Sequence, residues 1–202
     1  MGLRERKKAE TRQAVHEAAL RLTVELGFDA VTVEAIADAA NISRRTFSNY
    51  FAGKEDAVLY GEEQRIQDLV ERIRRRPAGE RAWPALCRAS AELYAAQGKE
   101  ADRAWATRTR LARRHPALLA RQLANQSLLE QEIAVEVAAR EDLDDHTLRP
   151  RVMAAAFLAA LRVAMVVWLD ERESRPLGEV LQASLSEVGE DFTRGGRLKV
   201  SE

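Results

Sequence analysis

The strongest constraint on this fold is residues 27–51, where two short helical patterns are separated by a tight turn at residues 41–42. The first pattern repeats apolar residues at helical spacing: Val33, Ile36, Ala37 and Ala40. Ser43 is placed to cap the second pattern, and Phe47 and Phe51 lie four residues apart on one of its faces. The segment therefore predicts two short helices that bury their apolar faces against a third.

That third helix is predicted over residues 6–26, whose apolar stripe is followed by a glycine. The two short helices, joined by the tight turn at residues 41–42, have the layout of a helix-turn-helix, in which the second helix enters the DNA major groove. Lys+Arg and Asp+Glu both number 32, so net charge gives no bias toward nucleic acid. Residues 1–12, however, hold five basic against two acidic side chains, and residues 43–51 hold two arginines and no acid. Positive charge is thus concentrated around the helix-turn-helix.

Helical spacing continues along the rest of the chain, so we predict an all-α fold of about nine helices. Prolines near helix starts indicate the later boundaries. Besides residues 6–26 and the two short helices, the expected helices are 54–76, 82–97, 99–114, 116–140, 148–172 and 176–192. We expect an N-terminal DNA-binding domain at 1–53 and a C-terminal helical ligand-binding and dimerisation domain at 54–202.

The sequence gives little support for an enzyme, a metal site, a cofactor or a membrane protein. The three histidines are scattered, no glycine-rich phosphate loop is present, and Cys87 lies in no nucleophile motif. No secretory signal follows the basic N-terminus. The apolar run 152–169 contains Arg162 and many alanines, which favours a buried helix over a membrane span. We therefore expect a cytoplasmic protein.

The chain resembles the TetR family of bacterial transcriptional regulators. The matching residues are Gly27-Phe28, Thr32-Val33, Ile36-Ala37, Ala40, Ser43, Thr46-Phe47, Tyr50-Phe51 and Lys54-Glu55-Asp56. The resemblance implies a homodimer that binds a palindromic double-stranded DNA operator and a small-molecule effector that moves the helix beginning at Lys54. The segment 115–177 is also similar to a regulatory subgroup linked to acyl-CoA-like ligands. Ser48 departs from the pattern, because many members have an aromatic residue there.

The expected DNA-binding residues lie at the starts of helices and on the second helix of the pair: Thr32, Ser43, Arg44, Arg45, Thr46, Ser48, Asn49, Tyr50 and Lys54. The two arginines can read guanine edges or neutralise phosphates. Ser43 and Thr46 can serve as cap partners, and Tyr50 can contact phosphate or pack beside the core. Lys54, at a helix start, can meet a phosphate. The basic residues 4–8 form either an arm that reaches DNA or a solvated tail.

The helix expected at 148–172 has two apolar sides. Large side chains on one side are candidates for a ligand pocket, together with two tryptophans elsewhere: Met153, Phe157, Leu161, Met165 and Trp168, with Trp83 and Trp105. The alternative is that they form ordinary core. The other side carries smaller apolar side chains and one arginine, and these are candidates for a dimer interface: Val152, Ala155, Ala159, Arg162, Val163 and Val166. Arg162 can bind a ligand anion or pair with an acid across the dimer.

Together these features predict a ligand-responsive DNA-binding regulator, a repressor released by a largely hydrophobic effector. The alternatives are a helical adaptor without DNA binding and a small-molecule enzyme. The arginine pair without neighbouring acids argues against the adaptor, and the lack of catalytic motifs argues against the enzyme.

Overall fold

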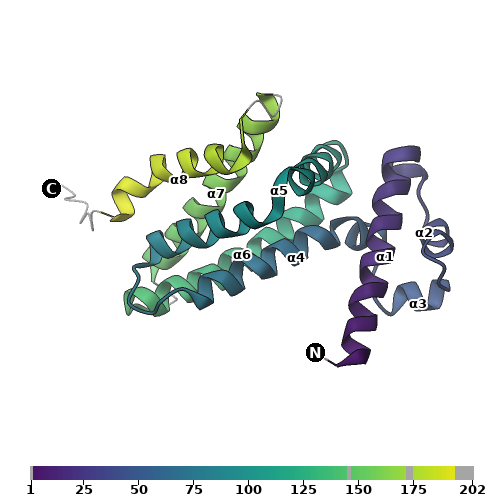
Figure 1. The fold of residues 1–202 in the computed structure, drawn as a ribbon, viewed down its shortest axis with the longest axis horizontal. Coiled ribbons are helices and arrows are strands. Elements are labelled where there is room, and N and C mark those ends of the chain that lie inside the picture. The colour runs from purple at the N-terminus through teal and green to yellow at the C-terminus, as the bar shows by residue number, and fades with distance from the viewer. Residues whose placement is uncertain (1, 145–146, 172–174, 194–202) are drawn as a thin grey trace. The chain divides into compact units, whose positions relative to one another are not determined.

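The computed structural model describes residues 2–144, 147–171 and 175–193. Within these residues the chain forms eight α-helices and one short 3-10 helix, η1, and the all-α prediction is confirmed (Figure 1). The elements are α1 (Leu3–Leu26), η1 (Phe28–Ala30), α2 (Val33–Ala39), α3 (Arg44–Ser48), α4 (Lys54–Arg75), α5 (Ala82–Arg114), α6 (Pro116–Glu141), α7 (Leu148–Asp170) and α8 (Leu177–Thr193).

Two boundaries differ from the sequence prediction. First, α1 begins at Leu3, so the basic residues 4–8 belong to its opening turns and not to a flexible arm. Second, α5 is one continuous helix, and the break expected between residues 97 and 99 is absent. Gly98 lies inside this helix, where a glycine costs only about 1 kcal/mol relative to alanine. The remaining boundaries agree within a few residues.

The chain divides into two compact units, residues 1–65 with 107–125 and residues 66–106 with 126–202. In the first unit, α2 and α3 lie beside α1, as Figure 1 shows. The core of this unit contains Val15, Ile36, Phe47 and Phe51, which the helix-turn-helix prediction requires. Gly27 ends α1 with φ of 81°, and its N–H donates to Thr23 O at 3.0 Å.

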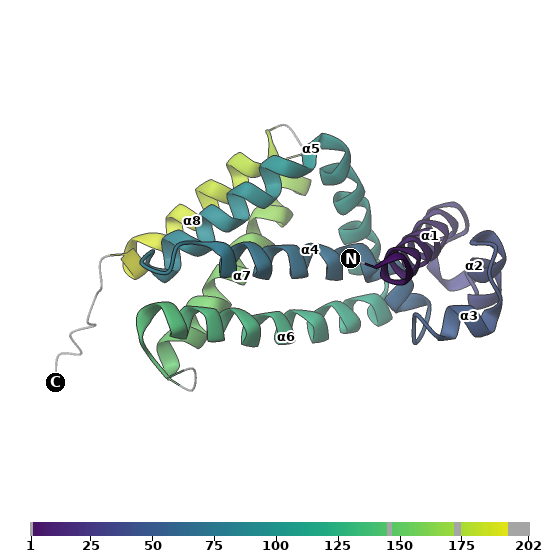
Figure 2. The same ribbon diagram turned by 60° about the horizontal axis from the view of Figure 1, so that its bottom comes forward.

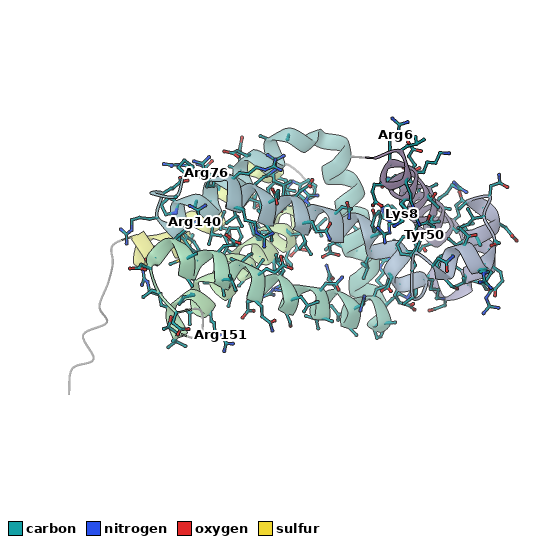
Figure 3. All side chains as sticks on the ribbon, turned by 90° about the horizontal axis from the view of Figure 1, so that it is seen from below. Arg6, Lys8, Tyr50, Arg76, Arg140 and Arg151 are labelled. Atoms are coloured by element: carbon teal, nitrogen blue, oxygen red, sulfur yellow. The ribbon has the colours of Figure 1, made fainter. Side chains whose placement is uncertain are left out.

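The second unit consists of the later part of α4, the first part of α5, the later part of α6, and α7 and α8. Figure 2 shows α8 alongside α5, and α7 packs extensively against α8. Ser184 Oγ on α8 donates to Ala160 O on α7 at 2.8 Å. The Arg140 guanidinium on α6 donates to Ile73 O at 2.6 Å and to Pro77 O at 2.8 Å, and Figure 3 shows it beside Arg76. Ile73 O and Pro77 O also accept the backbone N–H groups of Arg76 and Glu80, so the guanidinium supplies each with a second donor and joins α6 to the end of α4 and the turn after it.

Candidate nucleic-acid interface and regulatory unit

The turn between α2 and α3 is built from local hydrogen bonds. Thr32 caps α2, because its Oγ1 accepts the Ala35 N–H at 3.1 Å. Asn41 follows α2 with φ of 55°, a conformation that asparagine tolerates better than most residues. The Ile42 N–H then donates to Ala37 O at 2.9 Å, which reverses the chain toward α3.

Helix α3 is short and is held by its cap and its buried phenylalanine. Ser43 Oγ accepts the Thr46 N–H at 3.0 Å and lies 2.8 Å from Thr46 Oγ1, so these two residues are cap partners. Phe47 is fully buried, with its ring 5.7 Å from that of Phe51. The opposite side of α3 is exposed, and it presents four of the predicted DNA-binding side chains: Arg44, Arg45, Ser48 and Asn49.

Arg44 has an acidic neighbour that the sequence analysis missed. Its Nη1 lies 2.9 Å from Glu34 Oε1, and the two side chains are 73% and 54% exposed. The expectation that the arginine pair has no acid nearby is therefore wrong for Arg44. The reason is tertiary, because the turn brings the first turn of α2 beside the start of α3. Such an exposed ion pair contributes only about 0.2–1 kcal/mol, so a phosphate or base can compete for the guanidinium.

A basic groove lies between the start of α1 and Tyr50. Its lining residues are Leu3, Arg4, Lys7, Lys8, Thr11 and Tyr50. Figure 3 shows Lys8 and Tyr50 close together at this end of α1. Tyr50 is half-buried, and the Arg12 Cζ lies 5.7 Å from its ring centroid. The sequence signal for this groove is the helical spacing of the basic residues; the structure places them on α1 and not in an arm or tail.

Lys54 is engaged inside the first unit. Its Nζ donates to Phe28 O and to Val31 O, both at 2.9 Å, and lies 4.4 Å from the Phe28 ring centroid. Two of its three N–H groups therefore bind the segment between α1 and α2. The predicted contact of this ammonium with a phosphate gains no support from this geometry and stays a prediction.

Residues from the α5–α6 junction also belong to this unit, which sequence reasoning did not anticipate. Leu118 is fully buried in the same core as Phe47, and the His115 ring lies 5.2 Å from the Phe28 ring. Arg121 Nε lies 2.7 Å from Asp56 Oδ1 on α4. The junction is thus packed against the helix-turn-helix and its neighbouring turn.

The ligand-binding residues predicted in the second unit are packed in its core. Met153, Phe157, Leu161, Met165 and Trp168 are all buried. Trp83 is also buried and meets Phe157 edge to face at 6.2 Å, and Trp168 Nε1 donates to Arg175 O at 2.8 Å. The side chain of Trp105 lies outside the described residues. This arrangement has the form of the ordinary-core alternative, and a pocket role for these residues stays a prediction.

The predicted dimer residues occupy the opposite side of α7. Val152 and Val163 are 44% and 47% exposed, Arg162 is exposed, and Ala155, Ala159 and Val166 are half-buried. In the described part of the chain, α7 is long and apolar enough to cross a membrane, but half of that stretch is buried against its own unit. Core helices of water-soluble proteins have the same character, so this is weak support for a membrane span. The structure leaves one apolar side of α7 uncovered.

Metal-binding clusters are absent from the described residues, since no three His, Cys, Asp or Glu side chains are grouped closely enough to hold an ion. His146 falls outside the described residues. Cys87, on α5, is a partly buried free thiol, and burial raises its pKa to about 11. At neutral pH the nucleophilic thiolate is therefore scarce.

Comparisons with known proteins agree with the fold and its two parts. The family described as bacterial regulatory proteins, tetR family, matches residues 16–59, and the MftR C-terminal domain matches residues 80–193. The chain is 34% identical over 176 residues to the HTH-type transcriptional regulator TcmR of Streptomyces glaucescens, covering 83% of this chain and 76% of that protein.

Solved structures share the fold at lower identity. FadR of Thermus thermophilus, a TetR-family repressor solved with lauroyl-CoA, matches with a TM-score of 0.56 at 21% identity, covering 94% of this chain and 97% of that one. A TetR-family regulator from Streptomyces coelicolor matches with a TM-score of 0.55 at 20% identity, covering 93% and 80%. From these matches and the geometry of α1 to α3, the chain belongs to the TetR family and is a transcriptional regulator, not an enzyme.

Proposed function

We propose that this regulator is a repressor that binds a palindromic operator as a homodimer and leaves it when a small hydrophobic effector binds. The observation that carries the proposal is the exposed side of α3. There Arg44, Arg45, Ser48 and Asn49 stand opposite the buried Phe47, so the helix is anchored on one side and free to contact DNA on the other. Operator binding would place α3 of this domain, residues 1–53, in the major groove.

Within this proposal the arginines and the basic groove have different tasks. Arg44 and Arg45 contact guanine edges or phosphates from the first turn of α3. Tyr50 and the cations of the groove, Lys7 and Lys8, contact the phosphate backbone. Phosphate contacts fix the orientation of the protein without reading sequence, and they make the affinity depend on salt.

The proposed dimer forms through the uncovered side of α7. Small and β-branched residues there, Ala155, Ala159, Val163 and Val166, permit close approach of a second copy of the helix. An apolar side of this length on a water-soluble protein needs a partner. Arg162 lies at the edge of this side, where it can pair with an acid of the second protomer. A dimer with two copies of α3 is what a palindromic operator requires.

The proposed effector is largely hydrophobic and binds the domain at residues 54–202. The FadR structure with lauroyl-CoA provides an example of such a ligand in this fold, and an acyl-CoA-like molecule is one candidate class. The large side chains of α7, from Met153 to Trp168, remain the predicted contacts. The proposed location is the cytoplasm, where the DNA is found.

The test is operator binding by the double variant Arg44→Ala/Arg45→Ala. A matched control is Arg74→Ala/Arg75→Ala, which removes two adjacent exposed arginines from the other unit. The assay is fluorescence anisotropy on a duplex selected by the wild-type protein. The first variant should bind this duplex with an affinity at least about 30-fold lower, because each base-reading arginine contributes about 1–3 kcal/mol to binding. The control should bind like wild type. Equal affinity and salt dependence for all three proteins would show that α3 is not the DNA-reading helix.

A further inference from the structure

A second groove lies between α5 and α8, and Trp83, one of the residues predicted for a ligand pocket, lines it. It has a volume of about 440 Å³, within the range of small-molecule sites. Its lining residues come only from these two helices: Trp83, Cys87, Arg88, Ser90, Ala91 and Tyr94 on α5, and Gly178, Leu181, Gln182, Leu185, Ser186 and Gly189 on α8. All of them belong to the second unit.

The groove follows the two helices lengthwise. Trp83 at the start of α5 meets Gly189 near the end of α8, so closely that a Cβ on Gly189 would lie 2.4 Å from Trp83 Nε1. The helices therefore run in opposite directions, as Figures 1 and 2 both show. Trp83 and Tyr94 are separated by about 16 Å along the helix axis, at 1.5 Å per residue. The groove is long enough for an elongated molecule lying between two aromatic side chains.

The chemistry of the lining favours a neutral, apolar occupant. Leu181 and Leu185 are buried and form an apolar floor, and small residues leave room above it. The Ser90 hydroxyl already donates to Cys87 O at 2.9 Å. The one charged lining residue, Arg88, is paired with Glu80. A charged ligand would find no uncompensated opposite charge here, and burying an unpaired charge is costly.

We propose that the α5–α8 groove binds an uncharged, elongated small molecule with an aromatic or aliphatic body, and that this molecule is the effector. The second half of the proposal rests on the proposed repressor function, whereas the binding does not. This proposal replaces the α7 contacts predicted for the effector, because none of those buried side chains lines the groove. It also assigns the effector to the uncharged hydrophobic class and not to the acyl-CoA-like class. A ligand in the groove would contact Trp83, and Trp83 packs against Phe157 in the core. The ligand would therefore act on the core through Trp83 while remaining outside it.

The chain has a built-in reporter for this site, because Cys87 is its only cysteine and lines the groove. The probe is N-phenyl-1-naphthylamine, an uncharged aromatic molecule whose fluorescence rises in apolar surroundings. Alkylation of Cys87 by iodoacetamide is followed by intact mass, with and without the probe. At a probe concentration about ten times its Kd, alkylation should be about tenfold slower. Unchanged alkylation at saturation, or no binding of the probe, would overturn the proposal.

Two substitutions test the location. Ala91→Trp fills the groove from α5, and Ala96→Trp places the same bulk on an exposed position of the same helix outside the groove. The first should abolish probe binding, and the second should leave it unchanged. If Ala91→Trp fails to fold, as judged by circular dichroism, Ser186→Trp blocks the groove from an exposed position on α8. Probe binding of wild-type affinity in a folded, groove-filling variant would overturn the proposal.

Operator binding separates this proposal from the proposed function. The probe should lower the operator affinity of the wild type and of Ala96→Trp but not of Ala91→Trp. If all three proteins bind operator and none responds to bound probe, the effector role of the groove is wrong while DNA binding stands. If none binds DNA although the probe protects Cys87, the repressor function is wrong while the groove remains a binding site.

Discussion

Replacing Lys54 by methionine tests whether this residue braces the helix-turn-helix or contacts DNA. Its ammonium donates to Phe28 O and Val31 O, each at 2.9 Å, and lies 4.4 Å from the Phe28 ring. Both carbonyls belong to the irregular segment between α1 and α2. Methionine keeps most of the aliphatic stem but removes both hydrogen bonds and the cation over the ring.

The expected cost follows from those contacts. A hydrogen bond to a charged group contributes about 1.5–3 kcal/mol, and two such bonds from one ammonium are not additive. We expect Lys54→Met to lower the free energy of unfolding by about 2–4 kcal/mol and the Tm by about 4–16 °C. The assay is urea and thermal unfolding followed by circular dichroism. The control is Lys8→Met on α1, which should change stability by less than about 0.5 kcal/mol.

Salt dependence of operator binding then distinguishes the two roles. A residue that braces the fold leaves the slope of log affinity against log salt unchanged, provided that the protein is folded. A residue that contacts a phosphate lowers the slope by about 0.9. We expect an unchanged slope for Lys54→Met and a reduced one for Lys8→Met. Lys54→Met as stable as Lys8→Met, with a reduced slope, would refute the bracing role.

Three further outcomes are expected. Gly189→Ala should lower the free energy of unfolding in urea by about 1–3 kcal/mol, because the new Cβ would lie 2.4 Å from Trp83 Nε1. Gly178→Ala is the control, since a Cβ at that position would meet no atom within 4 Å. Equal effects of the two substitutions would contradict the close approach of Gly189 to Trp83. Arg140→Met should lower the free energy of unfolding by at least about 2 kcal/mol, because it removes the charged hydrogen bonds that join α6 to Ile73 O and Pro77 O; an unchanged urea midpoint would show that these bonds do not stabilise the fold. Alkylation of Cys87 should keep accelerating from pH 9 to pH 11, because burial raises its pKa to about 11 and the protonated thiol persists to higher pH; a plateau near pH 9 would mean an exposed thiol.

The helix-turn-helix could be predicted from the sequence because its signals are local. The caps at Thr32 and Ser43 act on amides three residues away, and Phe47 and Phe51 share a face by helical spacing alone. The residue after α2, Asn41, is one of the few types that favours positive φ. Family resemblance over these residues then led to the correct family.

Contacts between distant segments could not be predicted in the same way. Glu34 pairs with Arg44 only because the turn folds α2 back along α3, and Leu118 enters the first core from α6. Neither contact leaves a periodic signal. The expected break in α5 failed for a different reason, since a single glycine at position 98 is too weak to end a helix on its own.

The residues predicted for a ligand pocket show the limit of apolar patterns. A stripe such as Met153, Phe157 and Leu161 has the same spacing whether it fills a core or lines a cavity, and here these side chains are buried. The α5–α8 groove depends instead on small residues of two helices that are far apart in the sequence, Ala91 and Gly178 among them. Their common groove becomes visible only when the helices are placed side by side.

Sequence-specific DNA binding by a dimer is tested most directly by selection from a random duplex pool with the full-length protein at near-physiological salt. We expect enrichment of an inverted repeat whose half-sites lie about one helical turn, or a multiple of it, apart. A folded, dimeric protein that enriches no sequence, either alone or with cell metabolites added, would contradict the proposed operator binding.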